Sequence, residues 1–598
     1  MAAKKDPGLP GDPIDLYLRW GLVYGFGSLF KLPGLVGLLI QWKSSEAAQE
    51  ARRFVPDDAS LPGIYLVPRG KPEQIPPFWS ITVPVKSLGS FLDAVKDLAI
   101  SIELAAPVAP SRLATSQNVS PALSTTKVLM AVLDDGCAFA NASFRDPGGT
   151  RVIWLWNQDP DALGAPVLPF GYGGQWSKGD LDLMFPAGGT QDEAYRDAGL
   201  PGLRRSAAHG THVMDLLTGE DPAASSSDIV FVQFPKEGID DPTGVWLKGF
   251  AWDGLLYVVV NAGANTKRIV ANISWGPQTG PHDGTYVLEA YIDWLIQVEK
   301  SIGRELIVTL PAGNSFSARA HAQVSYRVGG SVDWILPPDG EIQTFVEFWW
   351  PKSVLPGNAR LQVIAPGQAP VNLVVGPNPS PDGSWQAVLG QVGSSTRALV
   401  TVNATAAKSG VKGRDGRWQF VIPGTAGGAP KPVDIYVARS DHNMGAQRRA
   451  KASYLTDAGV EKQRFVAASD RYNEATGSAI RRAGTLNGIA TGKGSKVAAG
   501  YVWKTKEPAP YSSSGPTRGP RTGPDYALVT DRSEARPGVR GAGVRTGTKF
   551  RLVGTSTAAP QLGRLLAAKT LPKPPPPSDP ERTGNGRVVP LPTVIGLE

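Results

Sequence analysis

Residues 554–560 of the sequence read Gly-Thr-Ser-Thr-Ala-Ala-Pro, between an alternating run at 549–553 and an apolar run at 560–566. The first run is typical of a strand and the second of a helix that begins with proline. Ser556 is therefore predicted where a strand meets a helix start, whose partial positive charge favours a developing oxyanion. For this stretch alone, a Ser/Thr helix cap is the alternative. Partners elsewhere in the chain must decide between a cap and a nucleophile.

The composition describes a globular chain with room for several domains. Its 598 residues exceed the usual size of a single core, and 41% apolar with 19% charged residues exclude a disordered chain. The single cysteine, Cys137, excludes an intramolecular disulfide and a cysteine-rich metal site. The formal charge of +8 is scattered along the chain and forms no basic stripe with interleaved aromatics. We therefore expect no nucleic-acid partner.

Residues 1–50 form an apolar, glycine-rich leader without an evident secretory signal. Its two apolar runs, 20–30 and 32–42, are each shorter than the roughly 20 residues that a membrane-spanning helix needs. We expect the leader to pack on the protein surface, with membrane contact as the minor alternative. The lack of a signal and the single cysteine favour a cytoplasmic location, and secretion by another route stays open.

Residues 51–126 show a β-then-α pattern that ends in a linker. An alternating run at 79–85 indicates a half-buried strand, Ser90 is expected to cap a helix, and residues 102–104 suit a second short strand. Residues 107–126 are rich in Pro, Ser, Thr and Ala, which predicts a linker and a domain boundary.

From residue 127 the pattern is that of an α/β domain. Continuous apolar runs predict buried parallel strands at residues 128–133, 229–233, 269–273 and 306–310. Helical stretches at 243–261 and 286–302 alternate with them. We therefore expect residues 127–319 to begin a doubly wound parallel sheet, in which functional groups gather beyond the carboxyl ends of the strands.

A change of pattern interrupts this α/β domain. Residues 320–451 contain short alternating segments separated by Pro, Gly and Asn, which predicts an inserted β-sandwich. Residues 452–570 return to the α/β pattern. The proline-rich tail, 571–598, is expected to be a semi-rigid, exposed extension.

Three further motifs supply partners for Ser556. Asp134 ends the first predicted strand in Asp-Asp-Gly, His209 opens a predicted helix in His-Gly-Thr-His-Val, and Asn314 follows the fourth strand in Pro-Ala-Gly-Asn-Ser. A carboxylate can orient an imidazole, an imidazole can accept a hydroxyl proton, and an amide can donate to an oxyanion. Taken singly, the motifs of Asp134 and Asn314 are ordinary turns. His209 and His212 also suit a metal pair, but no HExxH pattern accompanies them, so we predict no metal site.

In this order, the four motifs resemble those of the subtilisin-like serine proteases, the subtilases of peptidase family S8. The resemblance covers roughly residues 127–566 without the inserted segment. It implies that Asp134, His209 and Ser556 form a catalytic triad and that Asn314 belongs to the oxyanion hole. It also implies that no cofactor is required for the chemistry. A structural calcium ion stays open, although no dense carboxylate loop matches a calcium site strongly.

The resemblance extends to substrate binding. Ser274, Trp275 and Gly276 match the family segment that pairs with the substrate backbone as an added strand. Trp275 either lines a subsite or packs in the core. Ala312 and Gly313 precede the oxyanion asparagine and are implied to bind substrate as well. His212 matches the family's second histidine and is expected to be structural.

The expected function is that of a serine endopeptidase that hydrolyses proteins or peptides through an acyl-enzyme on Ser556. Two alternatives stay open. In one, the β insertion recognises a partner protein on a latent protease scaffold; in the other, a transpeptidase uses the same acyl-enzyme. Residues 51–106 resemble a subtilase propeptide only in their β-α pattern, so autoprocessing in the linker is a hypothesis. A segment at 154–205 is expected to be a loop region that could cover the site.

Overall fold

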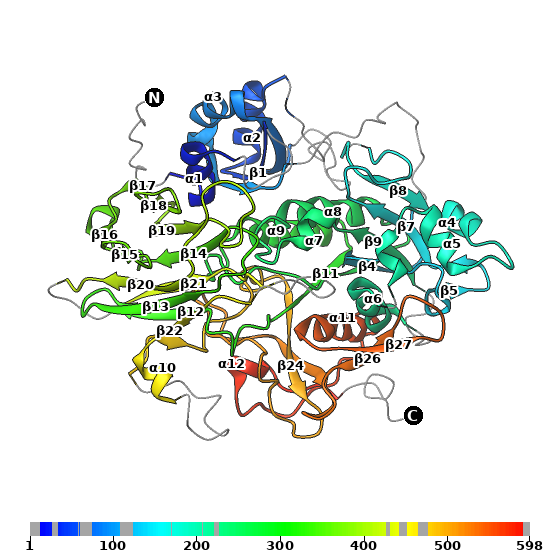
Figure 1. The fold of residues 1–598 in the computed structure, drawn as a ribbon. Coiled ribbons are helices and arrows are strands. Elements are labelled where there is room, and N and C mark those ends of the chain that lie inside the picture. The colour runs from blue at the N-terminus through cyan, green and yellow to red at the C-terminus, as the bar shows by residue number, and fades with distance from the viewer. Residues whose placement is uncertain are drawn as a thin grey trace.

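The computed structural model describes residues 12–26, 34–57, 59, 75–107, 123–168, 170–205, 207–219, 227–425, 431–441, 451–463 and 477–589. Three parts pack together: an N-terminal unit, a central α/β domain and a β-rich insertion (Figure 1). Within these ranges, no helix combines the length and the apolar character needed to cross a membrane. Most of the expected linker and the last nine residues of the tail lie outside the described residues.

The N-terminal unit is a three-stranded antiparallel sheet with the order β2 (Phe78–Pro84), β1 (Leu35–Trp42), β3 (Ala99–Ala105). Three helices accompany it, namely α1 (Leu16–Tyr24), α2 (Ser45–Ala51) and α3 (Val85–Val95). Because β1 is the central strand, residues on both sides of position 50 share one sheet. The expected division between a leader and a separate β-α segment is therefore wrong.

The helix α3 begins earlier than expected. Pro84 ends β2 and precedes the first helical residue, Val85, whereas Ser90 lies inside the helix and its hydroxyl donates to the Ser87 carbonyl. A proline terminates the strand because it cannot donate to the ladder, and its fixed φ suits a helix start. The cap expected at Ser90 is therefore wrong.

The α/β domain is built on an eight-stranded sheet with the order β25-β24-β11-β10-β4-β9-β7-β8. Only β7 and β8 pair antiparallel; the other neighbours are parallel. The strands are β4 (Val128–Asp134), β7 (Val152–Asn157), β8 (Gly174–Ser177), β9 (Asp228–Gln233), β10 (Arg268–Ile273), β11 (Glu305–Pro311), β24 (Lys496–Val502) and β25 (Tyr526–Asp531). The four strands predicted from apolar runs are β4, β9, β10 and β11. The doubly wound parallel sheet is confirmed.

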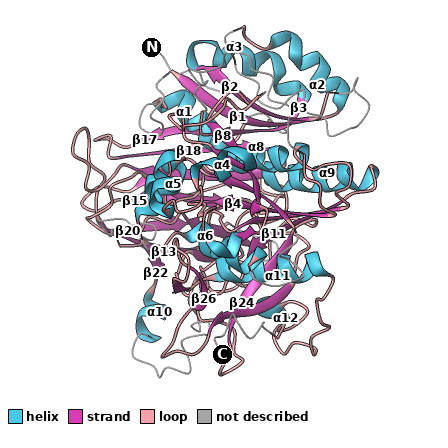
Figure 2. Ribbon diagram, turned by 90° about the vertical axis from the view of Figure 1, so that its right-hand side faces the viewer, coloured by secondary structure: helices cyan, strands magenta, loops and turns pink. Residues whose placement is uncertain are grey.

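Helices cover both faces of this sheet (Figure 2). Helices α6 (His209–Thr218) and α11 (Ala558–Ala568) contact one face, and α8 (Lys248–Val260) and α9 (Val287–Ser301) contact the other. Helix α8 is buried on nearly all sides because it lies between the central sheet and β1 and β2 of the N-terminal unit. A helix without a polar face requires such a position. The N-terminal unit is therefore a fourth layer of the fold.

The segment at 154–205 is not the expected loop region. It contains most of β7, then β8, α4 (Lys178–Met184), α5 (Gln191–Asp197) and a 3₁₀ turn at Pro201–Arg204. The run Val-Ile-Trp-Leu-Trp-Asn of β7 is fully buried, since it extends the sheet beyond β9. The segment thus forms one edge of the sheet.

The insertion consists of two antiparallel sheets that share one apolar core, so the predicted β-sandwich is confirmed. The first sheet has the order β17-β18-β19-β14-β21-β12-β23 and the second β16-β15-β20-β13-β22. Ten of the strands are β12 (His321–Ser325), β13 (Gly330–Leu336), β14 (Thr344–Trp349), β15 (Gln362–Ile364), β16 (Val371–Asn372), β17 (Gly376–Pro379), β18 (Trp385–Val392), β19 (Ser395–Val402), β20 (Gly416–Ile422) and β21 (Pro432–Val437).

The insertion continues beyond the expected boundary at residue 451. Strand β22 (Tyr454–Thr456) pairs with β13, and β23 (Ile480–Arg481) pairs with β12. Helix α10 (Ala458–Gln463) lies between them in the chain. Both strands are too short to show a clear alternation, so the return to the α/β pattern was placed too early.

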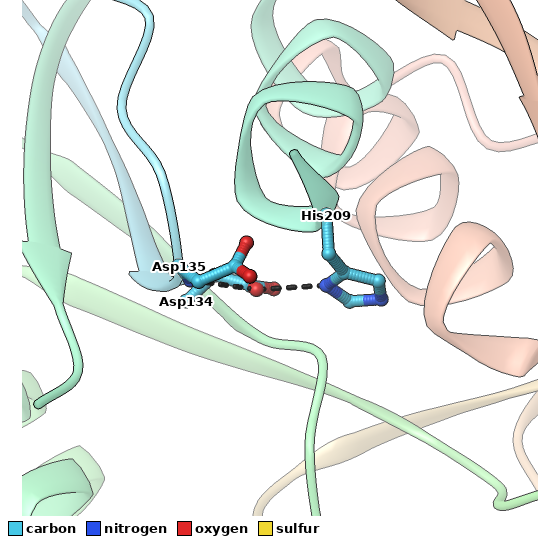
Figure 3. A group of neighbouring side chains, drawn as sticks. All are labelled: Asp134, Asp135 and His209. Carbon is cyan, nitrogen blue, oxygen red and sulfur yellow. Dashed lines mark hydrogen bonds and ion pairs between the residues drawn. The ribbon is translucent and has the colours of Figure 1, made fainter. Parts of the chain in front are cut away.

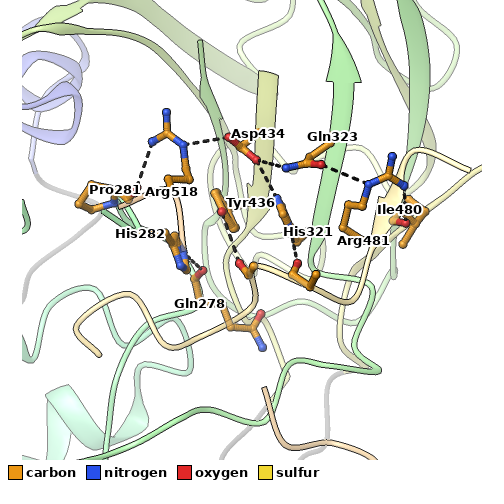
Figure 4. Close-up of polar contacts among 12 residues, drawn as sticks. Gln278, Pro281, His282, His321, Gln323, Asp434, Tyr436, Ile480, Arg481 and Arg518 are labelled. Atoms are coloured by element: carbon orange, nitrogen blue, oxygen red, sulfur yellow. Dashed lines mark hydrogen bonds and ion pairs between the residues drawn. The ribbon is translucent and has the colours of Figure 1, made fainter. Parts of the chain in front are cut away.

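A polar cluster attaches the insertion to the loop that follows β10 (Figure 4). The Tyr436 ring is stacked between the rings of His282 and His321, with centroid distances of 4.0 and 4.4 Å. Asp434 accepts from Arg518 Nε at 2.9 Å and lies 3.1 Å from His321 Nε2. The second nitrogen of His321 lies 2.8 Å from the Ala483 carbonyl, so both ring nitrogens face acceptors. The sandwich is thus anchored by charged hydrogen bonds as well as by packing.

The described part of the tail is not an exposed extension throughout. Its proline run is largely exposed, but α12 (Pro580–Thr583) packs on the α/β domain. Arg582 is buried, and its Nη2 donates to the carbonyl of Ala509 at 2.7 Å. Val588 is buried as well, beside the strand β25. The expected exposed extension is therefore wrong for the residues after the proline run, because Arg582 and Val588 are buried against the α/β domain.

A buried ion pair joins the N-terminal unit to α8. Lys248 Nζ donates to Glu103 Oε2 at 2.8 Å, with side-chain exposures of only 2% and 9%. Asp15 lies 4.0 Å from the same ammonium group. Burial disfavours the charged amine, but Glu103 and neighbouring groups outweigh it and raise the pKa of Lys248. A full charge is therefore held between the two parts of the molecule.

We predict that Glu103→Gln lowers the thermal unfolding midpoint, because it leaves the buried Lys248 charge with only the more distant carboxylate of Asp15. Removing one partner of a buried ion pair costs about 3–5 kcal/mol. Differential scanning calorimetry at neutral pH measures the effect. Arg417→Gln, which breaks the more exposed pair with Asp333, is the matched control and should change the midpoint little. Equal midpoints for Glu103→Gln and wild type would contradict the role of the pair.

Candidate active site

Three neighbouring strands end at the candidate site. Strands β4, β10 and β11 lie side by side and run parallel, so their carboxyl ends meet at one edge of the sheet. Asp134 ends β4, Ser274 follows β10, and Asn314 follows β11. Polar side chains that are far apart in the sequence are thereby placed together.

Helix α6 places His209 beside the end of β4. His209 Nδ1 lies 2.7 Å from Asp134 Oδ1, with side-chain exposures of 25% and 7% (Figure 3). Burial disfavours the imidazolium ion, but the charge and hydrogen bond of Asp134 outweigh this and raise the pKa of His209 to about 9. With Nδ1 held by the carboxylate, Nε2 is the nitrogen left to exchange a proton.

The neighbouring Asp135 fixes this arrangement. Its side chain accepts from the Gly210 N–H at the start of α6, and its own N–H donates to Asp134 Oδ1, each at 2.8 Å. Asp134, Asp135 and His209 offer ligand atoms within 4.8 Å of one another, the spacing of a metal site. All three already take part in these hydrogen bonds, an arrangement that fits an acid–base pair.

Ser556 lies in the turn between β27 (Lys549–Leu552) and α11, as the sequence predicts for a strand followed by a helix. Strand β27 forms a hairpin with β26 (Val539–Ala542). Gly554 has a φ of 130°, and a Cβ atom there would lie 3.3 Å from both Ser556 Oγ and Asn314 Nδ2. The hydroxyl and the amide therefore border the same small space, which a side chain at position 554 would occupy.

The neighbour Thr555 orients Asn314. Asn314 Oδ1 accepts from the Thr555 N–H at 2.9 Å and from the Thr555 hydroxyl at 3.0 Å. The same hydroxyl accepts from the Gly313 N–H at 3.1 Å. Because its carbonyl oxygen is engaged, the Asn314 amide presents Nδ2 to the cavity as a donor.

A chain of buried hydrogen bonds holds the turn that contains Ser556. Thr309 Oγ1 donates to Asn272 Oδ1 at 3.0 Å, Asn272 Nδ2 donates to Ser274 Oγ at 2.8 Å, and Ser274 Oγ donates to the Ser556 carbonyl at 2.9 Å. Ser274 was expected to bind substrate, and the structure places its hydroxyl on the backbone of Ser556. In the sequence, these hydrogen bonds are indicated only by the polar residues Asn272 and Thr309 inside the apolar strands β10 and β11.

One cavity of about 420 Å³ contains Asp134, His209, Asn314 and Ser556. Of the expected substrate-binding residues, Ser274, Trp275, Gly276 and Gly313 line it, whereas Ala312 is buried behind the wall. Among the described residues, no hydrogen bond links His209 to Ser556; such bonds are often long before substrate binds. A larger cavity of about 580 Å³, near Phe250 and Phe345, contains none of the four groups. The smaller cavity is therefore the candidate active site.

The structure shows the surroundings of Trp275 and His212, two side chains whose roles the sequence leaves open. Trp275 packs partly against the apolar core and also lines the cavity, so its position is compatible with both alternatives. His212 is fully buried, and its Nε2 lies 3.1 Å from the Val539 carbonyl. Burial lowers the pKa of His212 to about 3, so it is a neutral ring that ties α6 to β26.

No protein-family model and no curated protein matches the sequence. Among solved structures, the CspB protease of Clostridium perfringens, a subtilisin-like enzyme, aligns with 78% of this chain and 93% of its own. The TM-score is 0.56 at 18% sequence identity. The chain has the subtilisin-like fold. The PatG macrocyclase in complex with peptide also aligns with 78% of this chain and 90% of its own, but its TM-score of 0.30, at 11% identity, is too low to support an argument.

Within this subtilisin-like fold, local sequence patterns did not reveal every residue around Ser556. Thr555 is part of the quoted motif, but its bonds to Asn314 join positions far apart in the chain. Asn272 lies in a strand predicted to be apolar, and Asn487 lines the cavity from a turn that carries no motif. Contacts between distant parts of the chain, rather than local patterns, place these residues next to Ser556.

We predict that His209 titrates near pH 9 and that Asp134→Asn lowers this pKa by at least one unit, because the carboxylate stabilises the imidazolium ion. NMR of the histidine ring signals across pH 5–10 measures both values. Asp441→Asn is the control, since Asp441 lines the same cavity but is paired with Arg439. An unchanged His209 pKa in Asp134→Asn would show that the observed hydrogen bond does not control it.

Proposed function

We propose that the protein is a serine endopeptidase, which hydrolyses peptide bonds through an acyl-enzyme on Ser556. One observation carries the proposal. The hydrogen-bonded pair of Asp134 and His209 lines the same cavity as the Ser556 hydroxyl and the Asn314 amide. A base, its orienting acid, a nucleophile and an oxyanion donor are the groups that acyl transfer requires.

In the first step, the neutral form of His209, which predominates above its raised pKa of about 9, removes the proton of Ser556 Oγ through Nε2 as the oxygen attacks the peptide carbonyl carbon. Asp134 stabilises the imidazolium ion that forms. The developing oxyanion accepts from Asn314 Nδ2 and from the Ser556 N–H at the start of the helical turn. His209 then donates its proton to the leaving amine. Water, activated by His209, hydrolyses the ester and restores the hydroxyl.

Residues 274–276 are suited to hold the substrate backbone. They continue β10 beyond the sheet and line the cavity beside Ser556. An extended peptide added to this segment would form main-chain hydrogen bonds along its length. Such pairing depends little on side chains, so it fits an enzyme that accepts protein or peptide chains.

The two alternatives predict different products. A transpeptidase would pass the acyl group to an amine, and product masses would then show a new peptide bond in place of a free carboxylate. A binding protein on a latent scaffold would give no covalent Ser556 adduct. The complete set of four groups around one cavity favours hydrolysis over latency.

We expect a fluorophosphonate probe to label the wild-type protein at Ser556, because the probe reacts with serines activated by a base. Ser556→Ala should abolish labelling and hydrolysis of a peptide library. Ser317→Ala, which changes an exposed serine near the site, is the control and should retain both. Intact-mass and peptide-mass analysis provide the readout. A folded wild-type protein that neither labels nor cleaves would refute the proposed function.

We predict that Asn314→Ala lowers kcat by about 10²–10³-fold with little change in KM, the loss expected for one oxyanion donor. Thr555→Val should lower kcat less, because it removes one of the two bonds that orient the Asn314 amide. Steady-state kinetics on one cleavable peptide compares both variants with wild type. A change confined to KM would place Asn314 in substrate binding instead.

A further inference from the structure

A gap opens between two chain segments next to Ser556. Strands β10 and β11 pair up to Asn272 and Thr309, after which their continuations separate. In the segment after β10, the Ser274 hydroxyl donates to the Ser556 carbonyl. In the segment after β11, the Gly313 N–H donates to the hydroxyl of Thr555, next to Ser556. Both continuations line the catalytic cavity. A substrate whose carbonyl points to Asn314 and whose backbone follows residues 274–276 directs the side chain of its attacked residue into this gap.

Asn487 fills the gap. A Cβ atom at Gly276 would lie only 1.9 Å from both Nδ2 and Oδ1 of Asn487, so the amide is packed directly against the Gly276 backbone. On the other side, a Cβ atom at Gly313 would lie 3.4 Å from Asn487 Cβ. Asn487 is 4% exposed. Gly276 thus leaves the room that the Asn487 amide occupies, whereas a Cβ atom at Gly313 would meet Ser513 Oγ first, at 3.0 Å.

Hydrogen bonds fix Asn487 in this position. Its Nδ2 donates to the Trp275 carbonyl at 3.1 Å, and its backbone N–H donates to the Ala312 carbonyl at 2.7 Å. Its Oδ1 accepts from the Ile489 N–H at 3.2 Å. The residue therefore bridges both continuations. A large substrate side chain could enter only by displacing this amide and leaving buried polar groups without partners, which is unfavourable.

We propose that Asn487 is a specificity-determining residue, which restricts the residue at the scissile carbonyl, P1, to glycine, alanine or serine. The proposal rests on the proposed endopeptidase function and adds a substrate class to it. Binding of a small P1 residue leaves the bridge of Asn487 intact. The function of the glycine at position 276 is then to accommodate the residue that closes the pocket.

The kinetic test compares two peptides that differ only at P1, alanine in one and phenylalanine in the other. In wild type we expect kcat/KM to be at least tenfold higher for alanine, because phenylalanine can enter only by displacing the hydrogen-bonded Asn487 amide. Asn487→Ala should lower this ratio at least tenfold by opening the gap. The control is Asn378→Ala, which removes a similarly buried amide with backbone bonds on an edge strand of the insertion.

Two results would overturn the proposal: a wild-type preference for phenylalanine, or an unchanged ratio in an Asn487→Ala enzyme that still hydrolyses. The wild-type ratio decides the matter even where the variant fails to fold. Retention of the ratio in Asn378→Ala is expected, since that residue is remote from the cavity.

A binding experiment separates this proposal from the proposed function. Peptides that end in alanine or phenylalanine are titrated into Ser556→Ala and into the double variant Ser556→Ala/Asn487→Ala by calorimetry. We expect the alanine peptide to bind Ser556→Ala at least tenfold more tightly, and the double variant to lose this difference. Selective binding without hydrolysis in wild type would refute the endopeptidase and retain the role of Asn487. Equal binding of both peptides, or no binding of either, would refute the role of Asn487.

Discussion

The parallel pairing of β4, β10 and β11 is the constraint on which the rest of the site depends. Each strand is buried on both faces and ends at the same edge of the sheet, so polar side chains gather at these ends and just beyond them. Asp134 is the last residue of β4, Ser274 directly follows β10, and Asn314 lies three residues beyond the end of β11. A shift in the register of one strand would separate them, although no side chain had changed.

The turn that contains Ser556 is held to this edge by contacts from two directions. Below it, the chain from Thr309 through Asn272 and Ser274 reaches the carbonyl of Ser556. Beside it, Thr555 binds both Gly313 and Asn314. These contacts fix the backbone while the Ser556 hydroxyl faces the cavity. Preorganisation of this kind lets the site stabilise a developing charge without moving at the moment of reaction.

The sequence predicted what depends on local pattern. Apolar runs marked β4, β9, β10 and β11, and short motifs marked Asp134, His209, Asn314 and Ser556, because a strand end or a helix start leaves a signature in adjacent residues. Long-range pairing left none. The central position of β1, the return of β22 and β23 to the sandwich, and the bridge made by Asn487 each depend on a partner far away in the chain. The apolar run that forms β7 falls in a segment predicted to be a loop, because nothing local ties it to β9.

The position of the insertion has a consequence for the order in which the molecule forms. Strand β11 must pair with β24 across the entire sandwich, and α11 with Ser556 follows only after that. Closing so long a loop costs entropy before the contact repays it, and pairings of high sequence separation form slowly. During synthesis, Asp134, His209 and Asn314 emerge well before Ser556. The nascent chain is thus without Ser556 until the sandwich has been synthesised, so the insertion delays the appearance of the whole candidate site.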